Sequence, residues 1–316
     1  MNLLIRVNRY LLRKAIRTLN GLLKLSEKLN ADFSTGVTSL KSQKDLVESA
    51  SKYDMFTASG ESYYADQYWQ LIEGFMPLNQ KEVQIVDLGS GQGRMVRKFL
   101  DNFPTAEIRC CDISEKAISN LQRNIALSPE QQVKAEVSEF GSFLSRQISS
   151  SVDIVLFTEV SFYSLGWETC LSDIYRILKP DGIFVSSHRS RYYNAMQLLS
   201  LGHIQAAERI LKNNSGRLFR NTDLQFSWND SSATSEILVA AGFSVKRVAG
   251  IGVLSGIKGD PHELLAEPGR LSKDDLSALM QLEKHFGGTV PDSGRYMLFV
   301  AKKTLKADAL TDKVSP

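Results

Sequence analysis

The stretch Val83-Gln84-Ile85-Val86-Asp87-Leu88-Gly89-Ser90-Gly91-Gln92-Gly93-Arg94-Met95-Val96-Arg97-Lys98-Phe99 contains the features that decide the fold. It begins with a short apolar run typical of a buried strand, continues with three glycines, and ends with apolar residues at helical spacing. The glycines are therefore expected at a strand-to-helix turn. In an open parallel sheet this turn lies at the carboxyl ends of the strands, where small ligands bind close to a backbone without Cβ atoms.

The spacing of the glycines distinguishes between classes of nucleotide site. A dinucleotide-binding turn reads Gly-x-Gly-x-x-Gly, but here the sixth position is Arg94 and the third glycine comes one residue early, at Gly93. A phosphate-binding P-loop ends in Gly-Lys-Ser/Thr, and this turn does not. The spacing therefore disfavours ATP and makes an NAD(P)-dependent oxidoreductase the rival interpretation rather than the preferred one.

Two further motifs follow in order. The apolar run from Ala106 to Cys111 ends in Asp112-Ile113-Ser114, about 20 residues after the loop, where a carboxylate can accept hydrogen bonds from both ribose hydroxyls. The segment 177–185 reads as a helix end, a Pro-Asp-Gly turn at Pro180 and a strand. Together with Asp-Leu-Gly-Ser-Gly-Gln-Gly, which starts at Asp87, these motifs resemble those of the class I S-adenosylmethionine-dependent methyltransferases over roughly residues 64–302.

The resemblance implies a fold, a cofactor and a set of site residues. The fold is an α/β, Rossmann-like, doubly wound sheet of seven strands with an antiparallel last strand, and the cofactor is S-adenosylmethionine. Glu136 is preferred over Glu139 for the family's acidic position on the adenine side. The implied cofactor-binding residues are Asp87, Gly89, Ser90, Gly91, Gly93, Asp112, Ile113, Glu136 and Glu159.

The length of 316 residues fits one α/β domain with additions better than two domains. We expect an N-terminal helix and linker over residues 1–60, the methyltransferase-like domain over 61–303, and a polar tail over 304–316. More than fifty residues separate the probable fifth and sixth strands, which indicates a helical cap inserted at about 189–235. A second insertion is expected at about 254–294.

Residues 1–30 carry seven basic side chains and one acidic one, a charge of +6 in a chain whose net charge is +3. Apolar residues share one face of this segment, so it predicts a basic amphipathic helix. The preferred interpretation is a helix that covers the domain's own apolar surface. The alternatives are peripheral contact with an anionic membrane or a partner, and a mitochondrial-type presequence. The apolar runs are too short for a transmembrane span or a signal-peptide core.

Composition indicates the class of protein, its redox compartment and whether a metal site is expected. A hydrophobic fraction of 43% and a charged fraction of 23% are typical of a globular protein with a large core. Three cysteines without a Cys-x-x-Cys pair, and four scattered histidines, predict neither disulfides nor a metal site and fit a reducing cytoplasm. The oligomeric state does not follow from the sequence.

Fewer sequence motifs indicate which molecule accepts the methyl group. The strand Val152–Phe157 is not followed by the Asn/Asp-Pro-Pro-aromatic motif of enzymes that methylate base amines or glutamine amides, which argues against a nucleic-acid partner. We therefore expect methylation of an O or N atom of a small molecule under the cap. The alternatives are a lipid-linked or protein acceptor, and a catalytically silent binding module.

Candidate acceptor-side residues follow the fourth and fifth strands. His188, directly after the fifth strand, is the predicted general base, and Tyr163, after the fourth, is the predicted orienting residue. An aromatic helix over residues 63–72 either packs on the sheet or closes the site. The residues that could wall the pocket are Tyr192, Tyr193 and Trp228.

Overall fold

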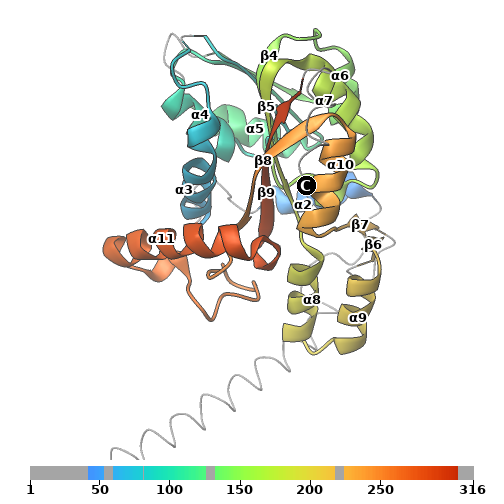
Figure 1. Cartoon of the computed structure of the whole chain (residues 1–316), viewed down its shortest axis with the longest axis vertical. Coiled ribbons are helices and arrows are strands. Elements are labelled where there is room, and N and C mark those ends of the chain that lie inside the picture. Colours follow the sequence, from blue (N-terminus) through green and yellow to red (C-terminus); the bar gives the residue numbers. More distant parts are fainter. Residues whose placement is uncertain (1–41, 53–59, 81, 126–131, 218–223, 305–316) are drawn as a thin grey trace, which may run out of the picture.

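The computed structural model describes residues 42–52, 60–80, 82–125, 132–217 and 224–304 (Figure 1). The predicted helix of residues 1–30 and most of the polar tail lie outside the described residues. Membrane contact through residues 1–30 therefore stays a prediction. Among the described residues, no helix combines the length and the apolar character needed to cross a membrane.

The glycine-rich stretch forms strand β1 (Gln84–Leu88), a turn, and helix α4 (Arg94–Asn102). β1 lies inside a seven-stranded sheet of order β3-β2-β1-β4-β5-β9-β8. Strands β1 to β5 are mutually parallel, whereas β9 runs antiparallel to both β5 and β8. The predicted doubly wound sheet with an antiparallel last strand is confirmed. The other strands of this sheet are β2 (Glu107–Asp112), β3 (Gln132–Val137), β4 (Val152–Phe157), β5 (Leu178–His188), β8 (Phe243–Ile251) and β9 (Tyr296–Lys303).

Helices cover both faces of the sheet because alternate side chains of each strand point to opposite sides. Ile85 and Val185 belong to the apolar core that also contains side chains of α3 (Glu61–Ile72), α4, α5 (Glu115–Asn124) and α11 (Lys273–Thr289). Val86 and Phe184 belong to the second core, with side chains of α6 (Phe140–Ser145), α7 (Leu171–Ile177) and α10 (Ser231–Ala240). Both faces of the central strands are thus buried.

The predicted Pro-Asp-Gly turn is not a separate turn. Helix α7 ends at Ile177, and β5 begins at the next residue, so these residues lie within β5. The pairing of β4 with β5 shifts at this point, where Val152 pairs with Leu178 and Ile154 pairs with Ile183. Between these two pairs β5 contains more residues than β4, and Asp181 in this stretch takes a left-handed φ of 61°.

Two helices between β5 and β8 lie at one end of the molecule (Figure 1), in the segment predicted to be a cap; we call them, with the short strands that follow, the cap. They are α8 (Arg191–Ser200) and α9 (Ile204–Lys212), followed by the short antiparallel pair β6 (Ser215–Gly216) and β7 (Phe226–Ser227). Their apolar side chains form a small third core that includes Phe162 of the 3-10 helix η2 (Ser161–Tyr163). Because η2 follows β4, the cap is packed against the carboxyl end of that strand.

Candidate active site

The turn from Gly89 to Gly93 has the geometry expected of a ligand-binding loop. All three glycines have positive φ angles, 72° for Gly89, 54° for Gly91 and 90° for Gly93. The backbone N–H groups of Gly89 and Ser90 donate to the Cys111 carbonyl at 2.8 and 3.0 Å, which joins the loop to β2. A Cβ on Gly89 would lie 2.3 Å from Val160, whereas one on Gly91 would meet nothing within 4 Å. The loop is therefore packed at Gly89 and open at Gly91.

Asp112, the last residue of β2, is held beside this loop. One carboxylate oxygen accepts a hydrogen bond from the Gly91 N–H at 3.0 Å, and the other accepts one from the Ser114 N–H at 2.9 Å. Burial raises the pKa of Asp112, and these backbone N–H groups oppose that rise. Each oxygen retains acceptor capacity for a further donor, as the predicted role toward a ribose diol requires.

Asp87, near the end of β1, lacks a partner in the part of the chain that the structure describes. It is 1% exposed, and neither of its buried carboxylate oxygens has a hydrogen-bond partner. Burial raises its pKa to about 7, repulsion from Asp112 adds to the rise, and the positive charge of Arg94 opposes it. A buried acid without a partner is costly, so this site is suited to a cationic group of a ligand.

The helix α2 (Gln43–Ala50) and the residue after it lie against the same loop. The Ser51 carbonyl accepts hydrogen bonds from the side-chain amides of Gln92 and Asn120, each at 3.3 Å. The Glu48 carboxylate accepts one from the Glu115 N–H at 2.9 Å. This N-terminal segment is therefore attached to both the glycine loop and α5.

Of the remaining predicted cofactor residues, Ser90 is buried and Ile113 is partly buried. The Glu136 side chain is 47% exposed and forms an ion pair with Arg146, just after α6. Its predicted contact with the adenine side of a cofactor stays a prediction.

Glu159 lies two residues beyond the end of β4 and belongs to a network of buried ion pairs. Its backbone has a left-handed φ of 63°, and its N–H donates to the Ser187 hydroxyl at 2.9 Å. Its carboxylate accepts from Arg94 at 2.6 Å, and Arg94 also pairs with Glu61 at the start of α3. Although burial favours the neutral acid, Arg94, Arg295 and Arg189 outweigh it and lower the pKa of Glu159.

The aromatic helix α3 contributes to this site as well as to the core. Tyr68 is fully buried, and its hydroxyl donates to the Ser187 hydroxyl at 2.8 Å, the same atom that accepts from the Glu159 N–H. The rings of this helix pack in the core, Tyr68 contacts Ser187 near the end of β5, and Glu61 pairs with Arg94 and Arg295; closure of the site by this helix stays a prediction.

His188 lies inside the core rather than beside the loop. Its ring is 4.4 Å from the Trp167 ring between centroids, and its Nε2 is 2.9 Å from the Ser186 hydroxyl. Burial lowers its pKa to about 3, so the imidazole is neutral at pH 7 and a weak proton acceptor. The neighbouring Ser187 side chain, on the opposite face of β5, is the one that meets Glu159. We therefore propose no catalytic role for His188.

Tyr163 is the last residue of η2, which follows β4, and its predicted orienting role stays a prediction. The centroid of its ring is 5.2 Å from that of the Phe162 ring. Burial raises the pKa of Tyr163, and the charge of the nearby Arg189 opposes this rise. The tyrosine is therefore neutral at pH 7 and able to donate a hydrogen bond.

The three predicted pocket-wall residues have different surroundings. Tyr193 is fully buried, whereas Tyr192 is 47% exposed. The Trp228 indole donates to the carbonyls of Ile210 and Asn213 at 3.1 and 2.6 Å, so it holds the cap together.

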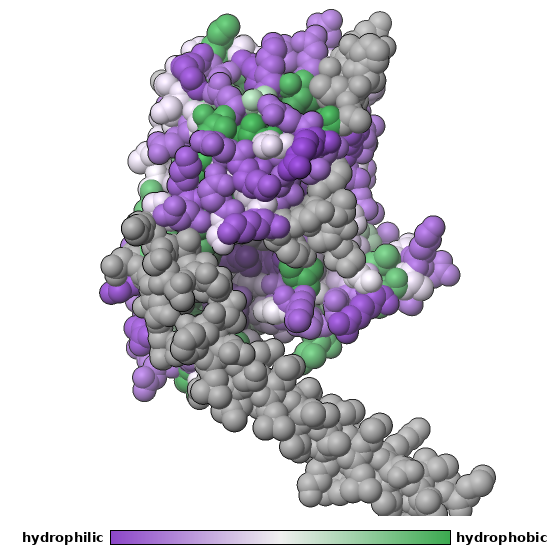
Figure 2. All heavy atoms as spheres, turned by 180° about the vertical axis from the view of Figure 1, so that it is seen from behind, coloured by the Kyte–Doolittle hydropathy of each residue, from purple (hydrophilic) through white to green (hydrophobic). Residues whose placement is uncertain are grey.

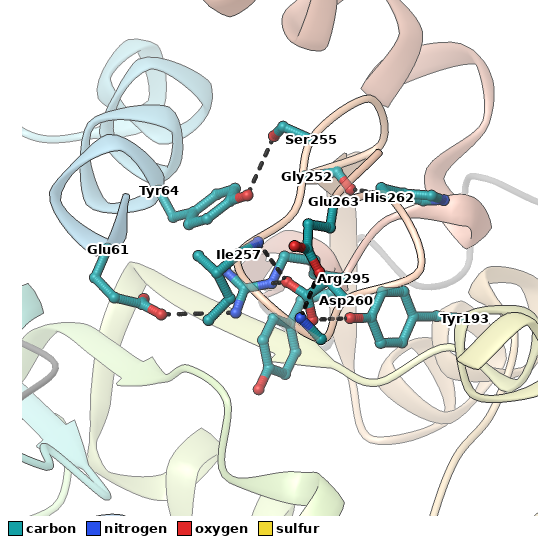
Figure 3. A network of polar contacts seen from close by, with 12 residues as sticks. Glu61, Tyr64, Tyr193, Gly252, Ser255, Ile257, Asp260, His262, Glu263 and Arg295 are labelled. Carbon is teal, nitrogen blue, oxygen red and sulfur yellow. Dashed lines mark hydrogen bonds and ion pairs between the residues drawn. The ribbon is translucent and has the colours of Figure 1, made fainter. Parts of the chain in front are cut away.

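Sequence reasoning missed the arginines of this region. In the sequence, Arg94 is distinguished only by its place in the broken dinucleotide pattern, and Arg189 and Arg295 belong to no motif. Arg295, directly before β9, lies between Glu61 and Asp260, and Asp260 also accepts a hydrogen bond from Tyr193 (Figure 3). The one available signal was position, since Arg189 follows β5 directly.

On the face opposite to that of Figure 1, the surface has a hollow with a hydrophilic floor (Figure 2).

Comparisons with known proteins agree with this geometry. Residues 86–184 match the model of a methyltransferase domain. Among curated proteins, none matches this chain. A Mesorhizobium loti S-adenosylmethionine-dependent methyltransferase is 16% identical, with 76% of this chain and 100% of that chain covered and a TM-score of 0.52. Magnesium protoporphyrin IX methyltransferase of Synechocystis PCC 6803, solved with bound S-adenosylmethionine, is 10% identical over 84% of this chain and 99% of that chain, with a TM-score of 0.50.

The matched segment begins in β1 and ends in β5, and so contains the glycine loop, Asp112 and Glu159. Both of these neighbours use S-adenosylmethionine, the first by its description and the second as the molecule bound in its structure. Residues 86–184 match a methyltransferase-domain model, and the sheet that contains them has the Rossmann-like fold of the class I S-adenosylmethionine-dependent methyltransferases.

Proposed function

We propose that this protein transfers a methyl group from S-adenosylmethionine to an O or N atom of a small molecule held between the sheet and the cap. The observation that carries the proposal is the pair of buried acids at the glycine loop. Asp112 is oriented by two backbone N–H groups, and Asp87 has two buried oxygens without a partner among the described residues.

These residues fit the cofactor's functional groups. Asp112 would accept hydrogen bonds from the ribose hydroxyls, and the open side of Gly91 would let the backbone approach the nucleoside. Asp87 would compensate the charge of the α-ammonium group. When bound, S-adenosylmethionine supplies an electrophilic methyl group on a positively charged sulfur.

The protein's own contribution is positioning and exclusion of water. Glu159 is kept ionised by its arginine neighbours, and its bond to Arg94 fixes the end of β4 against the start of α4. Tyr163 is kept neutral, so it can donate a hydrogen bond that orients the acceptor. Neither group is a strong proton acceptor at pH 7. This arrangement suits an acceptor whose nucleophilic atom is available without a protein base, such as a neutral amine or an ionised oxygen.

The cap supports a small acceptor over a macromolecular one. Helices α8 and α9 and Trp228 form a core with Phe162, so the cap is joined to the loop that carries Tyr163. A cap held in this position would favour an acceptor that can be enclosed. Localisation in the cytoplasm and peripheral membrane contact remain part of this proposal and not of the structural findings.

Two measurements test the proposed function. Calorimetric titration with S-adenosylhomocysteine should give binding, and titration with NAD(H) should not. Incubation of the protein and labelled S-adenosylmethionine with separate small-molecule, lipid and protein extracts should place the label in the small-molecule fraction. Label found in protein alone would refute the acceptor assignment. Cofactor binding without transfer to any fraction would favour a silent binding module.

A further inference from the structure

Arg189 differs from the two other arginines that line the ends of β4 and β5. Arg94 pairs with Glu159 and Glu61, and Arg295 pairs with Asp260. Within the described residues, Arg189 has no carboxylate within ion-pair distance, and its one hydrogen bond goes to the Tyr296 hydroxyl at 3.0 Å. Its Nε is buried without a partner. This guanidinium therefore has N–H donors that form no hydrogen bond with the described residues.

Aromatic rings surround Arg189 instead of acids. Its guanidinium carbon is 4.3 Å from the centroid of the Tyr296 ring, 4.6 Å from that of Tyr193 and 5.5 Å from that of Phe162. These contacts stabilise the cation through the ring quadrupoles. They do not satisfy its N–H groups, which need acceptors. Arg189 as a residue is only partly buried.

The position of Arg189 places it on the acceptor side of the site. It directly follows β5, whose Ser187 contacts Glu159 at the end of β4. Tyr193 lies in the cap, Phe162 lies in η2 beside Tyr163, and Tyr296 begins β9. Glu159 is near enough for the charge of Arg189 to lower its pKa, but its carboxylate forms its ion pair with Arg94, at 2.6 Å, and none with Arg189.

We propose that Arg189 binds an anionic group of the methyl acceptor, a carboxylate or a phosphate, so that the substrate is an acid rather than a neutral molecule or an amine without an acidic group. A planar guanidinium with several free N–H donors is suited to such groups. The surrounding rings would pack against the apolar part of the same molecule. This inference rests on the proposed function and narrows its substrate class.

The first test needs no variant. Full-length protein saturated with S-adenosylhomocysteine is titrated with benzoate, phenylacetate and phenyl phosphate, and with the neutral benzamide and phenylacetamide. We expect at least one anion to bind about tenfold or more tightly than its neutral counterpart. Equal affinity of acids and amides, or no binding of any anion, would overturn the proposal. Failure of S-adenosylhomocysteine to bind would instead overturn the proposed function.

A second test assigns the effect to one residue. In Arg189→Gln, the preference for the anion should fall about tenfold or more while the Kd for S-adenosylhomocysteine stays within twofold. Arg191→Gln is the matched control, because Arg191 lies two residues away and pairs with Asp230 and Asn214. The control should retain the preference.

The same variant shows whether Arg189 binds a carboxylate of the methyl acceptor or the carboxylate of the cofactor. If Arg189→Gln weakens S-adenosylhomocysteine binding and the anionic probes show no preference in the parent protein, Arg189 binds the cofactor's carboxylate and the acceptor proposal is wrong. Should Arg189→Gln not fold, Arg189→Lys keeps the charge but not the planar donor set. It should bind phenyl phosphate better than benzoate, because a compact ammonium does not form the bidentate carboxylate contact. A preserved benzoate affinity would contradict the proposal.

Discussion

Arg94, the first residue of α4, donates a hydrogen bond of 2.6 Å to Glu159, two residues beyond β4. This bond joins the end of the glycine loop to the neighbouring strand. Because Arg94 also pairs with Glu61, the first residue of α3, one guanidinium ties together three elements around the site. The loop, the acceptor side and the aromatic helix therefore form a single electrostatic unit.

Breaking this unit should destabilise the protein strongly. Arg94→Met leaves Glu159 and Glu61 without their shared partner, and removal of one member of a buried pair costs about 3–5 kcal/mol. Lys98→Met is the control, because Lys98 and Asp66 form a more exposed pair, for which we expect about 1 kcal/mol or less. Urea unfolding of both variants measures the difference. Equal free energies of unfolding would show that the Arg94 pairs contribute no more than surface ones.

Asp112→Ala should weaken cofactor binding without unfolding the domain. Loss of a charged hydrogen-bond acceptor costs about 1.5–3 kcal/mol, which corresponds to about 10- to 160-fold in the Kd for S-adenosylhomocysteine. Asp101→Ala serves as control, because the Asp101 side chain is 52% exposed on α4 and pairs with Arg97. Calorimetry on both variants checks this, and an unchanged Kd in Asp112→Ala would exclude the predicted ribose contact.

The pKa of Asp87 predicts a pH dependence of stability. Its folded-state value of about 7 lies above the ordinary value of 3.8, so the folded protein binds this proton more tightly than the unfolded chain. The contribution to stability is thus present below pH 4 and is lost as pH rises toward 7, with a limiting slope of about 1.4 kcal/mol per pH unit. Asp87→Asn should remove this component from the pH profile of urea unfolding. Identical profiles for the two proteins would contradict it.

The same carboxyl group should couple cofactor binding to protons. Pairing with an ammonium group requires the ionised acid, so S-adenosylhomocysteine affinity should fall as pH drops below 7, and binding near pH 6.5 should release a proton. Calorimetry in buffers with different ionisation enthalpies measures that release. Asp87→Asn should abolish it, and a release that persists in the variant would assign it to another group.

Two glycines of the loop should respond differently to the same substitution. Gly89→Ala puts a Cβ 2.3 Å from Val160 and strains a φ of 72°, so we expect a loss of stability of about 2–4 kcal/mol. Gly91→Ala meets nothing within 4 Å and should cost only about 1–2 kcal/mol for its φ of 54°, but its Cβ points to the open side and should weaken cofactor binding.

Thermal unfolding and S-adenosylhomocysteine titration of both variants separate the two effects. Adding Val160→Ala should restore part of the stability of Gly89→Ala and none of that of Gly91→Ala. Rescue of both variants, or of neither, would show that contact with Val160 is not the cause.

Local sequence determined the strand, glycine turn and helix around Gly89–Gly93, and the acid at the end of β2. Such elements follow from periodicity and from backbone angles that only glycine adopts readily, and both are properties of neighbouring residues. The same reasoning predicted the order of motifs that the seven-stranded sheet confirms.

The tertiary structure decided which side chains face the site. Both faces of β5 are buried, so the apolar pattern could not tell whether His188 or its neighbours pointed toward Glu159, and a shift of one residue exchanges the faces. The partners of Arg94, Arg189 and Arg295 come from segments far apart in the chain. Their pairing therefore depends on the packing of α3, the cap and β9 around the ends of β4 and β5, and only the folded chain brings these charges and rings together.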